Sequence, residues 1–139
     1  MRFLELDRFD YQKVEVLPEI VDAVCEFGKD AHPREFIMFL EGRVSGNVLR
    51  ITGLKYQEYF SNEDSAMPYI RLPIHSDVVG SVHSHPGPSN RPSRADLHFF
   101  SKQGLVHMII KRPYQPADIQ AYTSGGNPIS FEMAPNSKK

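Results

Sequence analysis

The sequence predicts a single domain of the α/β (α+β) class. Its 139 residues are 40% hydrophobic and 24% charged, which is enough for one core and too little for two domains. Short β-branched runs bounded by turn residues recur along the chain, whereas two stretches repeat apolar residues at helical spacing. We therefore expect one domain over residues 1–139, with a frayed tail from about residue 134.

The N-terminal part is expected to contain a strand and a helix. The alternation over residues 14–17 indicates a strand, and Pro18 follows it. Proline in the first helical turn loses only an amide that would be unpaired anyway, and apolar residues then recur at helical spacing, so the helix is predicted over about 18–31. Cys25 lies within it, either as a small, partly buried apolar residue or as a nucleophile. No base is visibly paired with it, which favours the first interpretation.

A hairpin and a long excursion follow the helix. Pro33 pushes the residue before it away from helical geometry, so the helix ends there. The apolar run 36–40 predicts a central strand, and the turn signal at 45–47 joins it to a second strand over 48–54. Residues 55–73 are polar and aromatic without clear periodicity, which is typical of functional loops or disordered segments.

The second half of the chain is predicted to contain further strands and one more helix. The β-branched run 78–82 indicates an interior strand that ends at two histidines. After a proline-rich loop, a helix starts at Ser93, whose hydroxyl suits an N-cap, and closes at Gly104. Three more strands are expected over 105–111, 118–123 and 128–133, with a glycine-rich turn at 125–127 before the last.

Charge and composition exclude several classes of protein. A net charge of −1 gives no general electrostatic footprint for nucleic acid. A single cysteine rules out an intrachain disulfide and a multi-cysteine zinc site, and it favours a reducing compartment. No run has the length of a signal peptide or a membrane span, so we expect a soluble, cytoplasmic protein with neither nucleic acid nor membrane as a partner.

Two histidines close the predicted interior strand. Side chains alternate along a strand, so His83 and His85 project from the same face, roughly 6.5–7 Å apart along the backbone. The loop over 86–92 ends the strand, and Asp96 can return a carboxylate after it. These residues predict a mononuclear zinc site. The alternative is an exposed histidine pair, with Ser93 and Asp96 serving only as a helix cap and a dipole partner.

Glu35 stands directly before the predicted central strand. A carboxylate at this place is either a solvated residue at the start of a strand or a functional acid that faces a cleft. Taken alone, the solvated interpretation is the more common one, because most glutamates are simply exposed. Its function therefore depends on what surrounds it.

The full pattern is more specific than its parts. The run from His83 to Pro86, six residues, Ser93, two residues and Asp96, with Glu35 upstream, resembles the signature of the JAMM (MPN-plus) metallopeptidases. The residues around it, 32–36 with Gly42 and 80–97, resemble the small single-domain archaeal members well beyond the minimal motif. The resemblance covers most of the chain and implies a curved mixed β-sheet flanked by helices, similar to cytidine deaminases.

The resemblance also implies a role for each residue of the pattern. His83, His85 and Asp96 would bind one catalytic zinc ion and leave a fourth position for water. Glu35 would act as general base toward that water and return the proton to the leaving amine. Ser93 would donate its hydroxyl to the oxyanion. Because a hydroxyl occupies one geometry at a time, we expect either this role or that of a helix cap.

The histidines outside the pattern are expected to be ordinary polar residues, and His98 is a candidate to lie near the metal without binding it directly. They are His32, His75, His98 and His107.

The substrate implied by the resemblance is a conjugated ubiquitin-like modifier. The expected activity is a zinc-dependent isopeptidase that hydrolyses the bond after the C-terminal Gly-Gly of the modifier, joined to a lysine amine. Archaeal members resemble deubiquitinase-like desampylases, which remove small archaeal modifiers. Residues near 58–69 are expected to become ordered when the modifier tail binds. The alternatives are a zinc peptidase of sulfur-carrier or cysteine metabolism and, less favoured, a non-catalytic interaction scaffold.

Overall fold

The described part of the chain is built from strands and two longer helices. The computed structural model describes residues 11–56, 77–102 and 104–135. Its helices are α2 (Pro18–Ala31), α3 (Arg94–Lys102) and the 3-10 turn η1 (Pro116–Asp118). Its strands are β1 (Lys13–Val16), β2 (Ile37–Ser45), β3 (Val48–Lys55), β4 (Val78–His85), β5 (Val106–Lys111), β6 (Ile119–Thr123), β7 (Pro128–Ile129) and β8 (Phe131–Met133).

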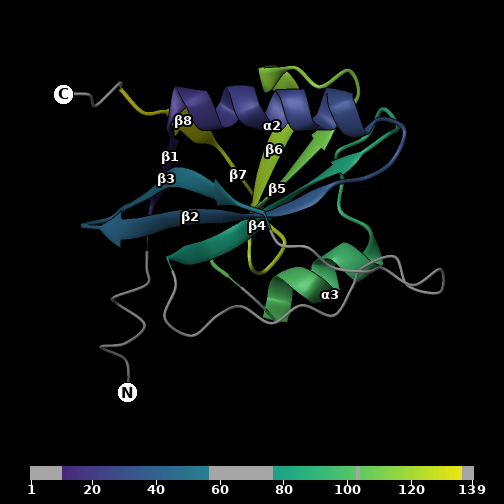
Figure 1. Cartoon of the computed structure of the whole chain (residues 1–139). Coiled ribbons are helices and arrows are strands. Elements are labelled where there is room, and N and C mark those ends of the chain that lie inside the picture. Colours follow the sequence, from purple (N-terminus) through teal and green to yellow (C-terminus); the bar gives the residue numbers. More distant parts are fainter. Residues whose placement is uncertain (1–10, 57–76, 103, 136–139) are drawn as a thin grey trace.

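All described strands belong to one mixed sheet (Figure 1). Its order is β7-β6-β5-β4-β2-β3-β1-β8. β4 lies inside the sheet, because it pairs with β2 antiparallel and with β5 parallel. The helix α2 covers one face of the sheet and α3 lies on the other side. The predicted α+β class, with helices flanking a mixed sheet, is confirmed.

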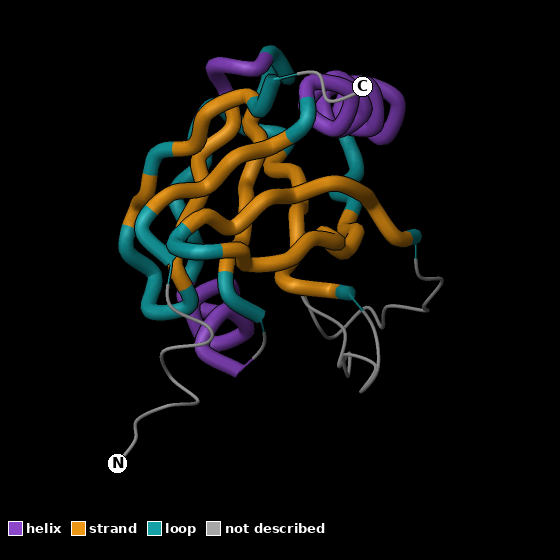
Figure 2. The backbone as a smooth tube through the Cα atoms, turned by 90° about the vertical axis from the view of Figure 1, so that its left-hand side faces the viewer, coloured by secondary structure: helices purple, strands orange, loops and turns teal. Residues whose placement is uncertain are grey.

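The sheet is strongly curved (Figure 2). β7 and β8 lie at opposite edges, yet Ser130 alone separates them along the chain. The sheet must therefore bend until one residue can connect its two edges. The predicted single strand over 128–133 is wrong in this respect, because β7 pairs antiparallel with β6 whereas β8 pairs parallel with β1.

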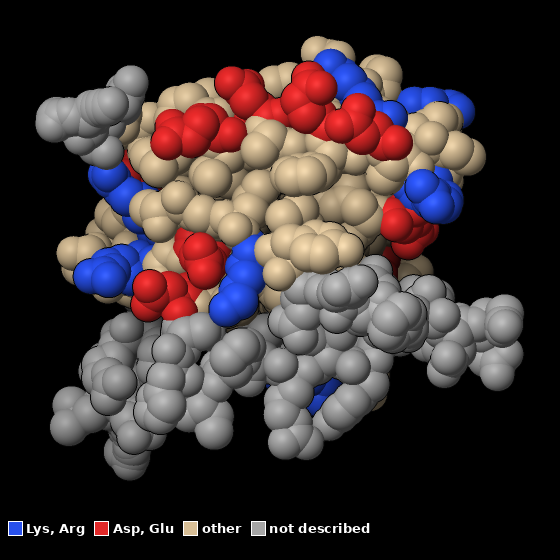
Figure 3. Space-filling model, in the orientation of Figure 1, with Lys and Arg blue, Asp and Glu red and all other residues tan. Residues whose placement is uncertain are grey.

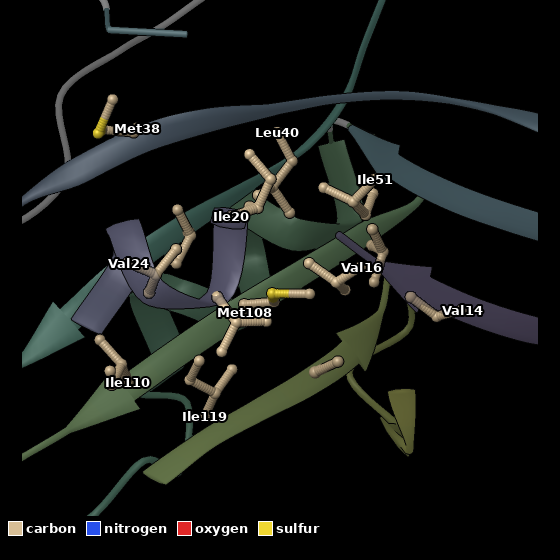
Figure 4. Packing of buried hydrophobic residues seen from close by; sticks show 14 of the residues in the cluster. Val14, Val16, Ile20, Val24, Met38, Leu40, Ile51, Met108, Ile110 and Ile119 are labelled. Atoms are coloured by element: carbon tan, nitrogen blue, oxygen red, sulfur yellow. The ribbon is translucent and has the colours of Figure 1, made fainter. Parts of the chain in front are cut away.

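The main core lies between α2 and the sheet (Figure 4). Ile20 and Val24 of α2 point toward Leu40, Met108 and other buried residues of the strands. Burying such side chains contributes about 1.5–3 kcal/mol each, which is the main force that holds the helix on the sheet. A smaller cluster lies on the opposite face, where Phe99 and Phe100 of α3 pack against sheet residues. This second cluster fixes the helix that carries Asp96.

The helix α2 has the bounds predicted from its sequence. Its inner face is buried, and Cys25 is among the buried residues, where burial raises the pKa of its thiol. Cys25 is therefore a small buried residue, which agrees with the interpretation that the sequence favours over a nucleophile. Phe27 lies at the margin of the buried face of α2, with 41% of its surface exposed and its ring 6.0 Å from that of Phe36. Acidic side chains line the outer face of α2 (Figure 3): Glu19, Asp22, Glu26 and Asp30.

The other predicted elements agree with the structure apart from their ends. The hairpin is present with its turn at Gly46, although β2 continues to Ser45. β4 includes both histidines and ends at His85, as predicted. Gly80 allows this strand to lie against β5, because a Cβ atom there would collide with the carbonyl oxygen of Val106. Substitution at Gly80 would push β4, and the histidines with it, away from β5.

Several predictions fall wholly or partly outside the described residues. Residues 57–76 contain most of the predicted excursion and the segment expected to bind a modifier tail, and they are not described. Of the predicted tail, Ala134 is buried and its amide donates to the carbonyl of Val16, so the fold extends at least to this residue. Within the described ranges, no helix is both long and apolar enough to cross a bilayer.

The buried carboxylate of Asp118 makes the stability of the fold depend on pH. It accepts hydrogen bonds from Nζ of Lys111 and the amide of Gln115, both at 2.8 Å. Burial raises the pKa of Asp118, but these donors outweigh burial and hold the pKa below its usual value. A group with a lowered folded-state pKa stabilises the fold above its unfolded pKa of about 3.9, and this contribution is lost as the pH falls through the folded value.

We expect Asp118→Asn to lower the free energy of unfolding by about 1–3 kcal/mol at neutral pH, because the partly buried Lys111 loses its charge partner. The difference from wild type should narrow as the pH falls below about 4, where Asp118 itself becomes protonated. Urea titrations at several pH values measure both quantities. A difference that stays constant down to pH 2 would mean that the charge of Asp118 contributes nothing.

Candidate metal centre

The site forms where the end of β4 meets the start of α3. His83 and His85 lie two residues apart on β4 and both reach Asp96 in the first turn of α3. Alternation along the strand places the two imidazoles on one face, as the sequence predicts. His83 is 2% exposed and Asp96 is 4% exposed, whereas His85 is only partly buried. The site is therefore closed to solvent at His83 and Asp96 and open to solvent on the side of His85.

The carboxylate of Asp96 lies between the two imidazoles. Nε2 of His83 is 3.2 Å from Oδ1, and Nε2 of His85 is 3.3 Å from Oδ2. The first pair has the distance of an ion pair but not the alignment of a hydrogen bond. Among the described residues, neither ring nitrogen of His83 has a hydrogen-bond partner. A buried nitrogen without a partner is costly unless another group binds it.

These distances suit tetrahedral zinc. Zinc binds histidine nitrogen at about 2.0–2.1 Å and carboxylate oxygen at about 2.0–2.2 Å, so neighbouring ligand atoms of a tetrahedron lie about 3.4 Å apart. The two nitrogen-to-oxygen distances, 3.2 and 3.3 Å, are close to this value. The three ligand atoms, one from each residue, all lie within 4.8 Å of one another. Two imidazoles and one carboxylate therefore fit a zinc ion in both chemistry and spacing.

The surroundings keep the carboxylate ionised. Burial raises the pKa of Asp96, but His83, His85 and the amide of Ser93 lower it by more, so the pKa lies well below its usual range. The hydrogen bond to Asp96 raises the pKa of His85 above its ordinary value, although burial opposes this. The nearby charge of Glu35 acts on His85 in the same direction as Asp96. An ionised carboxylate is the form in which Asp96 can bind a metal.

A backbone carbonyl sets the orientation of the His85 ring. Nδ1 of His85 lies 3.0 Å from the carbonyl oxygen of Ser89. A carbonyl can only accept, so Nδ1 is the donor in this bond. Nε2 is then the nitrogen that faces Asp96. A hydrogen-bond partner on one ring nitrogen of a ligating histidine fixes which nitrogen remains to bind a metal.

Ser93 and Asp96 cap the start of α3 reciprocally. The amide of Asp96 donates to Oγ of Ser93 at 3.0 Å, and the amide of Ser93 donates to Oδ2 of Asp96 at 2.8 Å. The hydroxyl only accepts in this capping box, so its own proton is not used there. The expectation that capping and donation exclude each other is therefore wrong. Ser93 can hold Asp96 in place and still donate to a further oxygen.

Glu35 opens onto the same cavity as the metal cluster. The cavity has a volume of about 430 Å³ and is lined by Glu35, His85, Pro86, Gly87, Pro88, Ser89, Ser93 and Asp96. Glu35 itself is exposed and belongs to the segment that leads into β2. The structure thus brings Glu35, Ser93 and the three predicted ligands together. Glu35 precedes the other four by 48 or more positions in the sequence, and the pairing of β2 with β4 brings them together.

Ser84 is a residue of the site that sequence reasoning passed over. It is 0% exposed, and its Oγ accepts the amide proton of Phe36 at 3.0 Å. Its own amide donates to the carbonyl of Phe36 at 3.1 Å. Ser84 therefore binds both polar groups of the residue that follows Glu35. Its place between two histidines was visible in the sequence, but its partner across the sheet was not.

The remaining histidines have different surroundings. His107 is fully buried, with Nδ1 2.7 Å from Oγ of Ser81 and its ring stacked on Phe100 at 4.4 Å, so it is part of the packing under α3 rather than an ordinary polar residue. His32 contacts the hydroxyl of Tyr114 at 2.7 Å. His98 is exposed on α3 and is not among the described residues that line the cavity. His75 lies outside the described residues.

Comparison with known proteins agrees with this geometry. Residues 17–125 match the Prok-JAB family, described as prokaryotic homologs of the JAB domain. A curated protein of Haloferax volcanii, described as a probable metalloprotease, is 32% identical over 125 residues, which cover 81% of this chain and 74% of that protein. The range that matches the Prok-JAB family includes the whole cluster of His83, His85 and Asp96.

Two solved structures share both fold and sequence with the chain. A JAB1/MPN domain protein from Archaeoglobus fulgidus is 31% identical, with a TM-score of 0.69, over 86% of this chain and 98% of that one. A structure described as JAMM, a metalloprotease-like zinc site in the proteasome and signalosome, is also 31% identical, with a TM-score of 0.67, over 88% of this chain and 99% of that one.

Proposed function

Because the chain belongs to the Prok-JAB family, whose JAMM-type members are zinc metalloproteases, we propose that it is an isopeptidase acting on conjugates of a ubiquitin-like modifier. The proposed reaction hydrolyses the bond between the C-terminal Gly-Gly of the modifier and a lysine amine. One observation carries the proposal: two of the three clustered ligands, His85 and Asp96, line one open cavity together with the exposed carboxylate of Glu35 and the hydroxyl of Ser93. A scaffold without catalysis would not need all of these groups.

In the proposed mechanism His83, His85 and Asp96 hold the zinc ion. When bound, zinc acts as a Lewis acid that lowers the pKa of a water and stabilises negative charge on a carbonyl oxygen. Glu35, which lines the cavity, accepts a proton from the attacking water and delivers it to the departing lysine amine. Ser93 donates its unused hydroxyl proton to the oxygen that becomes negative during the attack.

The cavity wall favours an extended substrate with little side chain next to the scissile bond. Pro86, Gly87 and Pro88 form part of that wall, and the two prolines make its backbone rigid. A diglycine tail is the peptide that makes the fewest steric demands on such a wall. A rigid wall of this kind supports a modifier ending in Gly-Gly over a peptide with bulky residues at that position.

The deciding experiment is a cleavage assay on a modifier joined through its C-terminal Gly-Gly to a lysine side chain. The matched control is the same conjugate with Ala-Ala in place of Gly-Gly. We expect zinc-dependent release of the modifier from the first conjugate, at least about 10-fold faster than from the second, since the proposed site takes a tail without side chains. Chelator should stop the reaction and added zinc should restore it. Equal cleavage of unrelated peptides would instead indicate a general zinc peptidase.

The hydrogen bond of Ser84 leads to a further prediction about Glu35. In Ser84→Ala the amide of Phe36 loses its partner, which loosens the segment that holds the proposed base. We expect kcat to fall about 10- to 100-fold while KM and zinc content stay near wild type, because displacement of a catalytic group by about 1 Å has effects of this size. Steady-state kinetics and metal analysis measure this.

Ser81→Ala is the matched control for Ser84→Ala. It removes another buried hydroxyl of β4, one that contacts His107 rather than β2. We expect the two variants to lose similar amounts of thermal stability, whereas only Ser84→Ala loses kcat. This result would support the role of Ser84 in positioning Glu35. Equal losses of kcat in both variants would show that the effect is only a general loosening of β4.

A further inference from the structure

We propose that Asn90 is a positioning residue that controls zinc affinity through His85. Asn90 is clamped between Tyr122 and Asp118, and this clamp fixes the Ser89 carbonyl that orients the His85 ring. The inference rests on the proposed zinc site but concerns metal binding, not the substrate. The described lining of the cavity includes neither Asn90 nor Tyr122, so both would act through the loop.

The peptide bond between Ser89 and Asn90 connects the clamp to the ligand His85. The carbonyl that accepts from Nδ1 of His85 belongs to this peptide unit. A peptide unit is planar, so the direction of the carbonyl is set by where the Cα atoms of Ser89 and Asn90 are held. Ser89 is exposed, and its side chain only accepts the amide of Arg91 within the same loop. Orientation of the carbonyl therefore depends on Asn90.

Asn90 is held from two sides by another part of the sheet. Its Nδ2 donates to the carbonyl of Asp118 at 2.9 Å, and its own carbonyl accepts from the hydroxyl of Tyr122 at 2.8 Å. These partners come from η1 and β6, about 30 residues further along the chain, as the separations of 28 and 32 show. The loop is thus tied to a fixed surface and not only to its neighbours in sequence.

Both partners of Asn90 are themselves firmly placed. Tyr122 is 5% exposed, with its ring 6.0 Å from Phe100, and burial raises the pKa of its phenol, so it keeps the proton that it donates. The carboxylate of Asp118 is bound by Lys111 and by the amide of Gln115. Lys111 ends β5 in register with His85 on β4. Through Lys111, the Asp118 side of the clamp is therefore connected to β5, the strand next to the one that carries His85.

Loss of the clamp would leave the ring of His85 free to turn. Zinc binding would then have to restrict the ring, and the free energy of that ordering would weaken the complex. Partners behind a metal ligand are typically worth about 10- to 100-fold in metal affinity. We therefore expect variants that release Asn90 to bind zinc at least about 10-fold more weakly than wild type.

The test uses Tyr122→Phe and Asn90→Ala, with Tyr11→Phe as matched control. Tyr122→Phe removes one hydroxyl and keeps the ring in the core, and Asn90→Ala acts in the loop without touching that core. The hydroxyl of Tyr11 also donates to a backbone carbonyl, that of Leu105 at 2.7 Å, but Leu105 is bonded to Val79 at the opposite end of β4. Competition with a chromogenic chelator gives the zinc Kd of each protein.

The expected result is a weaker zinc Kd in Tyr122→Phe and in Asn90→Ala, with Tyr11→Phe close to wild type. In the zinc-loaded proteins, NMR should show the hydrogen-bonded Nδ1 proton of His85 in wild type and in Tyr11→Phe, and faster exchange of this proton in the other two. Unchanged Kd values in both loop variants would overturn the inference, as would an equal loss in Tyr11→Phe. Wild type that binds zinc without cleaving conjugates would overturn the proposed function alone.

Discussion

Asp96→Asn is expected to lose zinc and to reduce hydrolysis by about 10³-fold or more. Asp96 is the one negatively charged member of the cluster and reaches both imidazoles. Asparagine keeps the shape, but it removes the charge that offsets the cation. Without the ion, several kcal/mol of charge stabilisation disappear, and about 4 kcal/mol corresponds to about 10³-fold in rate. Metal analysis of the purified protein and a cleavage assay measure both losses.

Glu15→Gln is the matched control for Asp96→Asn. Glu15 is a partly buried carboxylate in contact with cations, Arg50 at 3.0 Å and Lys13 at 3.5 Å, but it belongs to β1, away from the cluster. The control should keep its zinc and its activity. Chelated wild-type protein should stay folded, because the main core lies on the opposite face of the sheet from α3. An Asp96→Asn protein with full zinc content would remove Asp96 from the ligand set.

Local chemistry explains why much of this site could be predicted. Pro18 and the apolar spacing after it determine α2 within a single stretch of chain, and the bounds predicted from them are those observed. Alternation along β4 likewise requires His83 and His85 to share a face. The capping chemistry of Ser93 with Asp96 depends on a spacing of three residues, which is local to one helical turn.

Features that depend on pairing across the sheet were not predictable in the same way. Nothing in residues 128–133 indicates that they divide between two edges of the sheet, because each half is paired with a distant strand. The burial of His107 depends on Phe100, which packs over it from α3. Hydrogen-bond partners of Ser84 and Asn90 are 48 and 28 or more residues away. Such contacts arise only when the strand order is known.

Glu35 is the residue for which the local and the non-local information differ most. In the sequence it is a glutamate at the start of a strand, and in the structure it remains exposed. What changes its interpretation is the cavity that it shares with His85, Ser93 and Asp96, together with its electrostatic effect on His85. The hydrogen bonds between Ser84 and Phe36 hold its backbone beside the ligands. Its place at the cavity, next to the start of β2, therefore makes an ordinary exposed acid a candidate base.

Glu35→Gln is accordingly expected to reduce kcat by about 10²–10⁴-fold, the usual contribution of a general base, while zinc stays bound. Glutamine has nearly the same shape and can still accept a hydrogen bond, but it cannot take a proton from water. Loss of the negative charge near His85 should, if anything, lower the pKa of this ligand, so metal content should not depend on it. Single-turnover kinetics on zinc-loaded protein separate this loss of chemistry from a loss of metal.

Glu26→Gln provides the comparison, since it removes an exposed carboxylate from the outer face of α2, far from the cavity lining. It should behave as wild type in both zinc content and turnover. The mechanism requires the two variants to differ in zinc content. Asp96→Asn loses the ion and with it the activity, whereas Glu35→Gln keeps the ion and loses the activity. If zinc-loaded Glu35→Gln still turned over at the wild-type rate, the proton would have to leave by another route and Glu35 would not be the base.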